Sequence, residues 1–72
     1  MEADLFHANI KGANLSHADL RLATLEGADL RNANLKSTNL FRANLKGANL
    51  DGAILDGASF SEAIMPDGTR HP

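Results

Sequence analysis

Few side chains in this 72-residue sequence have the chemistry for catalysis or metal binding. His7 and His17 are candidate metal ligands or bases. His17 also stands between Ser16 and Asp19, which are the residue types of a nucleophile and of an orienting acid. There is no cysteine, so thiolate metal sites and disulfides are excluded. Any site therefore depends on whether the fold brings these side chains together.

A five-residue repeat determines how these side chains are placed. A large apolar residue recurs at every fifth position, as Leu5, Ile10, Leu15, Leu20, Leu25, Leu30, Leu35, Leu40, Leu45, Leu50, Leu55, Phe60 and Met65. Alanine stands two residues before each of them, except at Thr38. The residue between is mostly Asn or Asp, and no insertion breaks the pattern. Internal repetition of this kind is typical of a solenoid.

The period of five excludes both common elements. On an α-helix, five residues turn the chain by about 500°, so the leucines would scatter around the axis. On a flat strand, an odd period would point successive leucines to opposite faces. A chain that turns inward at each repeat gathers them in one core, with Ala and Leu inside and Asn or Asp outside.

The two residues after each leucine form a corner. Glycine occupies the second of them at Gly12, Gly27, Gly47, Gly52 and Gly57, where it would supply the positive φ of a type II turn. Asn32 tolerates the same conformation. The other corners carry residues that do not favour positive φ, and we expect type I or irregular turns there: His7, His17, Leu22, Ser37, Arg42 and Glu62.

The pattern A-(D/N)-L-x-x, seen in Ala13-Asn14-Leu15 and Ala43-Asn44-Leu45, resembles the pentapeptide-repeat family. The ending Ile64-Met65-Pro66-Asp67-Gly68 resembles members from cyanobacteria. The resemblance implies an all-β fold, a right-handed quadrilateral parallel β-helix with four repeats per coil. Residues 3–66 would then form about 3.6 coils of this solenoid, and residues 67–72 a short C-terminal tail.

In such a solenoid, residues twenty apart stack. We expect the Asn and Asp side chains to bond nearby backbone groups and steady the turns, rather than to form a binding array. Thr38 should point inward with its hydroxyl bonded to backbone, because an unpaired buried hydroxyl is costly.

The candidate catalytic groups do not converge in this geometry. His7 and His17 are two sides of the square apart, and Asp51 and Asp56 lie on adjacent sides. We therefore expect a protein that is not an enzyme, with no metal site and no cofactor.

Charge argues against nucleic acid as a partner, since the net charge is −2 with both signs mixed. No transmembrane segment or signal peptide is visible, and we expect a cytoplasmic protein. Some pentapeptide-repeat proteins imitate duplex DNA and inhibit DNA gyrase or topoisomerase, which is the alternative function. Lys11, Arg31 and Lys36 would interrupt the acidic face that this needs.

The favoured function is a structural or protein-interaction module. Phe41 faces outward and Leu22 occupies the corner one coil earlier, so the two should be neighbours. With Arg21 and Arg42 at the rim, they form a candidate contact patch for a protein partner.

The ends of a solenoid are its weak points, because an open coil exposes core and unpaired backbone. We expect the C-terminal end to be capped by Phe60, Met65 and the turn Pro66-Asp67-Gly68. The first coil looks uncapped. Two explanations are open: the chain is part of a longer protein, or its first coil stacks on a protein partner or on another copy.

Overall fold

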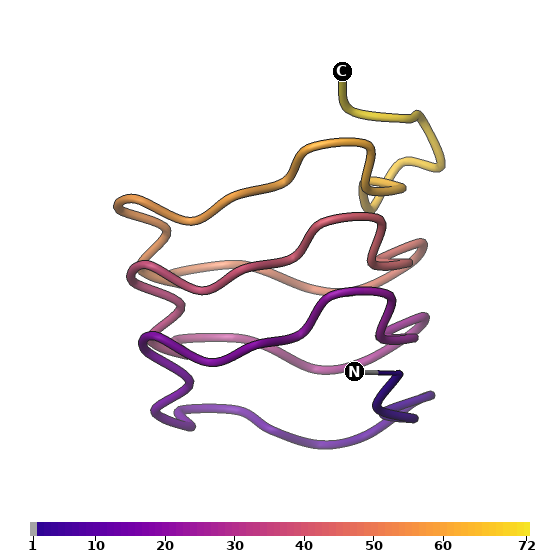
Figure 1. The fold of residues 1–72 in the computed structure, drawn as a ribbon. Coiled ribbons are helices and arrows are strands. Elements are labelled where there is room, and N and C mark those ends of the chain that lie inside the picture. The colour runs from indigo at the N-terminus through magenta and orange to yellow at the C-terminus, as the bar shows by residue number, and fades with distance from the viewer. Residues whose placement is uncertain (1) are drawn as a thin grey trace.

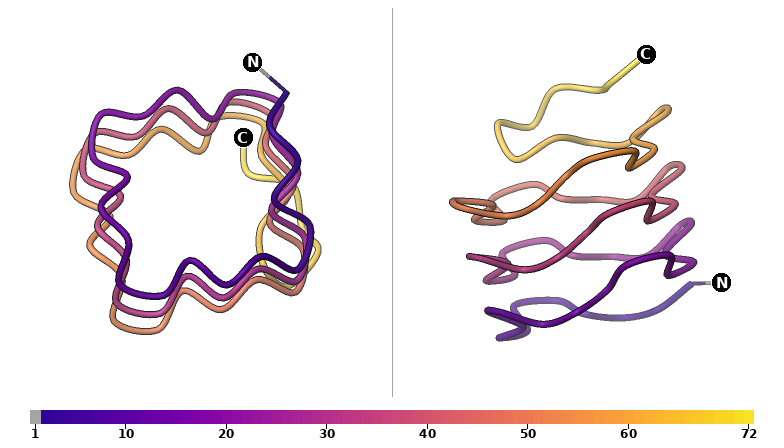
Figure 2. Two further views of the ribbon diagram at one scale, coloured as in Figure 1. Left: turned by 90° about the horizontal axis from the view of Figure 1, so that it is seen from below. Right: turned by 90° about the vertical axis from the view of Figure 1, so that its left-hand side faces the viewer.

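The chain winds upward as a square coil in the computed structural model, which describes residues 2–72 (Figure 1, Figure 2). Parallel β-bridges join residues twenty apart, from Asp4–Thr24 at the bottom to Asn44–Ile64 at the top. Twenty residues therefore complete one turn, and four repeats make one coil, as the resemblance implies.

Across residues 2–72 there is no helix. The β-structure consists of isolated bridges, which are parallel at the Asn/Asp position of the repeats and antiparallel between Ile64 and Arg70. The four sides of the square are named here by the segments that stack in them. Side 1 holds 3–5, 23–25, 43–45 and 63–65; side 2 holds 8–10, 28–30 and 48–50; side 3 holds 13–15, 33–35 and 53–55; side 4 holds 18–20, 38–40 and 58–60.

Hydrogen bonds in both directions hold each coil to the next. The Leu25 N–H donates to the carbonyl of Asn44 in the coil above at 2.7 Å. The Asn44 N–H donates down to the carbonyl of Ala23 at 2.9 Å. Because this pattern repeats on every side, each inner coil is hydrogen-bonded to the coil below it and to the coil above it.

The corners contradict one expectation. All of them have positive φ at the second residue, including Leu22 (64°) and Arg42 (56°), so none is a type I turn. The turn bond is present at each corner, as from the Ala23 N–H to the Leu20 carbonyl at 3.1 Å. The Leu22 N–H also donates to the carbonyl of Phe41 in the coil above at 2.9 Å. Bonding between stacked corners therefore overrides the preference of the individual residue.

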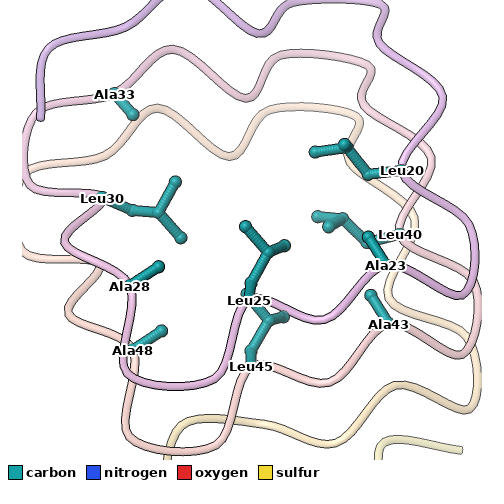
Figure 3. Close-up of a cluster of buried hydrophobic side chains, with 10 residues drawn as sticks. All are labelled: Leu20, Ala23, Leu25, Ala28, Leu30, Ala33, Leu40, Ala43, Leu45 and Ala48. Atoms are coloured by element: carbon teal, nitrogen blue, oxygen red, sulfur yellow. The ribbon is translucent and has the colours of Figure 1, made fainter. Parts of the chain in front are cut away.

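The core consists of leucines and alanines that point to the centre of the square (Figure 3). The middle leucines Leu25, Leu30, Leu35, Leu40 and Leu45 have no exposed surface. Alanine at the second inward position leaves room for them at native packing density. Thr38 is also buried, and its hydroxyl donates to the carbonyl of Leu15 at 2.8 Å, as predicted.

The C-terminal end is only partly capped, which corrects the expectation. The tail turns back at Pro66–Gly68 and lies over side 1, where the N–H of Met65 bonds the carbonyl of Thr69 and that of His71 bonds the carbonyl of Ala63, both at 2.7 Å. Within the described residues, the tail does not cross the other sides. Leu55 on side 3 consequently remains 38% exposed, although it occupies an inward position.

The part of the chain that the structure describes contains no helix of the length and apolarity needed to cross a membrane.

Candidate functional site

The histidines lie apart. His7 is at the corner between sides 1 and 2, and His17 is at the opposite corner, between sides 3 and 4. The His7 ring contacts Phe6, with ring centroids 4.2 Å apart, and His71 lies 6.3 Å from the ring of Phe60. In the stretch from residue 2 to 72, no group of acids and histidines is arranged to hold a metal ion.

Ser16 is not arranged as a nucleophile. Its hydroxyl donates to the side-chain carbonyl oxygen of Asn14 at 2.7 Å rather than to a base. The carboxylate of Asp19 is bound by Arg21 and does not orient His17. The order Ser16-His17-Asp19 is therefore a coincidence of sequence and not a constellation in space.

The Asn and Asp side chains are structural, as predicted. Each of them accepts a hydrogen bond from the backbone N–H two residues on, as in Asn34 with Lys36 and Asn44 with Lys46, both at 3.0 Å. The bond fixes the chain as it enters each corner. These side-chain oxygens therefore serve the fold, because each already accepts a backbone hydrogen bond.

The predicted contact patch lies at the corner between sides 4 and 1, where the structure brings Leu22 and Phe41 together. Their backbones are hydrogen-bonded, and Leu22 is 48% exposed whereas Phe41 is half-buried. The guanidinium of Arg42 lies 5.3 Å from the centroid of the Phe41 ring, within cation–π range. Arg21 is on the same corner, in the coil below Phe41.

Both arginines of this corner patch (Leu22, Phe41, Arg21 and Arg42) already have acidic partners. Arg21 makes a two-point bond to Asp19, at 2.8 and 2.7 Å, and this bond holds the pKa of Asp19 well below its usual range. Arg42 bonds Glu62 at 2.8 Å. The patch is thus an apolar centre with a rim of balanced charge.

Sequence reasoning did not include Asp19 and Glu62 in the patch, although the repeat contains the signal. Glu62 is one coil, or twenty residues, beyond Arg42, and Asp19 is two residues before Arg21, in the position that bonds the corner. Residues 2–72 enclose no pocket.

A family model described as "Pentapeptide repeats" matches residues 1–36 and 38–67 in 8 copies. The chain belongs to the pentapeptide-repeat family. Members of this family fold as right-handed quadrilateral β-helices, which agrees with the square coil described above. They are generally non-catalytic structural repeat proteins.

Two solved pentapeptide-repeat structures are similar to the chain. The first is HetL, described as involved in heterocyst differentiation regulation, from the cyanobacterium Nostoc sp. strain PCC 7120; it is 49% identical with a TM-score of 0.74, over 96% of this chain and 35% of HetL. The second, also from Nostoc PCC 7120, is 32% identical with a TM-score of 0.42, over 88% of this chain and 64% of its own. The chain thus spans about a third of the length of HetL. No curated protein matches it.

Proposed function

We propose that this pentapeptide-repeat chain is a non-catalytic protein-binding module that contacts its partner through the corner patch. The observation that carries the proposal is the exposure of Leu22. It is a large apolar side chain, 48% exposed, and it stands beside Phe41 at a corner that also carries Arg21 and Arg42. A small apolar centre ringed by charge is the composition of a protein-contact site.

The backbone at Leu22 supports the choice of this corner. A leucine at φ 64° is strained, whereas glycine or Asn would fit the same corner without that strain. The fold therefore does not need a leucine here. Seven non-glycine corner residues among residues 2–72 share this positive φ, and Leu22 is the one apolar residue among them, which supports a contact outside the chain at this corner.

A binding role also agrees with the similar protein HetL, which is described as involved in regulation. A protein-binding module can take part in regulation by contacting another macromolecule. For this chain we propose only a binding role of this general kind.

The alternative function, imitation of duplex DNA to inhibit gyrase or topoisomerase, has less support. Arg21 and Arg31 neutralise Asp19 and Asp29 on the outer surface. A DNA imitator needs continuous negative faces instead. Inhibition of gyrase supercoiling by micromolar protein would favour this alternative over the proposal.

Capture experiments test the corner patch. The chain is immobilised, and proteins captured from a cyanobacterial lysate are quantified and then titrated in purified form. Leu22→Asp should lower the affinity about tenfold or more, as expected for a central contact residue. Asp adopts positive φ more readily than Leu, so this variant keeps the fold.

The matched control is Ile54→Asp, because Ile54 is also 48% exposed but lies on side 3. Its binding should equal that of the wild type. Equal binding by wild type, Leu22→Asp and Phe41→Asp would disprove the corner patch as the contact site.

A further inference from the structure

At the top of the solenoid, some backbone N–H groups make no hydrogen bond to any other group within the described residues. In the inner coils, the N–H at such positions bonds the coil above, as from Leu30 to the Asn49 carbonyl at 2.8 Å. In the last coil the corresponding N–H groups have no such partner among residues 2–72: Leu50, Gly52, Leu55, Gly57, Phe60 and Glu62. We call this surface the C-terminal face.

The bottom of the solenoid carries the matching acceptors. The carbonyls of Thr24 and Glu26 accept bonds from Leu5 and His7 in the coil below. In the first coil the equivalent carbonyls accept no bond from residues 2–72: Asp4, Phe6, Asn9, Lys11, Asn14 and Ser16. This surface, the N-terminal face, also leaves the inward Leu5, Ile10 and Leu15 only half-buried.

We propose that the chain associates head to tail with a second copy of itself, the N-terminal face of one copy stacking on the C-terminal face of the other. The two faces are the upper and lower halves of the same contact that joins every coil to the next. The N–H donors of one face therefore meet the carbonyl acceptors of the other at the same spacing. This goes beyond the proposed function and uses a different surface from the corner patch.

The rise of the coil fixes the register. The last coil ends on side 1 with Met65, so the first segment of a second copy, residues 3–5, has to lie over side 2. That places its Leu5 over Leu50, its Ile10 over Leu55 and its Leu15 over Phe60. The apolar surface that each face leaves exposed is then covered by the other.

The charges agree with this register. It places Lys11 of the second copy over Asp56, at the corner between sides 3 and 4. Neither residue forms a salt bridge within residues 2–72. In a register turned back by one side, Lys11 would lie over Asp51 instead, but residues 3–5 would then collide with residues 63–65.

The tail competes for the same surface. Residues 69–71 lie over side 1, where residues 18–20 of the second copy would stack. Association therefore requires the tail to leave side 1. The Asp67 carboxylate steadies the tail by accepting bonds from the Thr69 N–H at 3.0 Å and the Thr69 hydroxyl at 2.6 Å.

Sedimentation equilibrium of the full chain, over a concentration series up to millimolar, tests the stacking. Wild type should show weak self-association, and Asp67→Ala should strengthen it several-fold by loosening the tail. Leu55→Lys should weaken it about tenfold or more, because the register buries an unpaired charge. The control is Ile54→Lys, an exposed neighbour on the outer surface, which should behave as wild type.

Cysteine cross-linking tests the register, since the sequence has no cysteine of its own. Stacked residues lie about 4.8 Å apart, which is within disulfide range. A mixture of Lys11→Cys and Asp56→Cys chains should oxidise to a heterodimer, whereas Lys11→Cys with Asp51→Cys should not. Monomers at every concentration for both wild type and Asp67→Ala would overturn the proposal, as would association that Leu55→Lys leaves unchanged. Neither result would bear on the proposal that the corner patch binds a protein partner.

Discussion

At the residue scale, the second residue of each corner has the least favourable backbone conformation in the chain. Leu22, Ser37 and Glu62 all adopt positive φ without being glycine. A left-handed conformation costs an ordinary residue about 1–2 kcal/mol. The chain tolerates this because each corner is bonded to a stacked corner above it, below it or both, which makes any other turn incompatible with the stack.

The strain predicts that Ser37→Gly stabilises the protein. Ser37 has φ 58°, and removing its side chain should raise the free energy of unfolding by about 0.5–1 kcal/mol, after the flexibility of glycine is subtracted. Urea denaturation measures the change.

The reverse substitution serves as the control for Ser37→Gly. Gly12 has φ 72°, and an added Cβ would meet no atom within 4 Å, so Gly12→Ala should cost about 1 kcal/mol through backbone strain alone. A lower stability of Ser37→Gly would show that the serine makes a compensating contact.

At the scale of one side and its corner, an Asn or Asp side chain fixes how the chain turns. Asp29 does so and also binds Arg31, at 2.9 and 2.8 Å. This bond to the guanidinium, followed by the bond from the Arg31 backbone N–H, lowers the pKa of Asp29 from 3.8 to about 2. The carboxylate is thus favoured in the folded chain.

This shift predicts a loss of stability in acid. A lowered pKa contributes stability that is present above the unfolded value of 3.8 and is lost as the pH falls through about 2. In Asp29→Asn, the amide oxygen retains the turn bond, as Asn34 does, but the group no longer titrates. The melting temperature should therefore fall less steeply between pH 5 and pH 2 in this variant than in the wild type. Parallel curves would contradict the contribution of the ion pair.

At the scale of the whole molecule, stability comes from stacking one coil on the next. Leu15, Leu35 and Leu55 share one column, but only Leu35 has a coil both above and below it. Leu35 has no exposed surface, whereas Leu55 is 38% exposed. The same side chain thus contributes differently at different heights of the solenoid.

Two alanine substitutions in this column measure the difference. Leu35→Ala should lower the free energy of unfolding by about 2–5 kcal/mol, because it leaves a cavity. Leu55→Ala should cost only about 1 kcal/mol, because water already reaches the site. Chemical denaturation at low protein concentration, where chains do not associate, gives both values, and equal losses would mean that the last coil is covered.

The repeat predicted the core and its spacing because Ala and Leu at a period of five allow one inward arrangement. Thr38 followed from the same logic, since a buried hydroxyl needs a backbone partner. The corners at Leu22 and Arg42 were predicted wrongly, because their conformation is imposed by neighbours twenty residues away and not by local preference. The partly open C-terminal face was also missed, since the path of residues 67–72 is not encoded in the repeat.

The bridges between residues twenty apart have a consequence for how such a chain can evolve. A duplication of five codons leaves the core intact but rotates every later outer residue onto the next side. A duplication of twenty codons adds one coil and keeps all columns aligned. Gene rearrangement can thus reposition a binding surface around the axis, or move it along the axis, without inventing a new core.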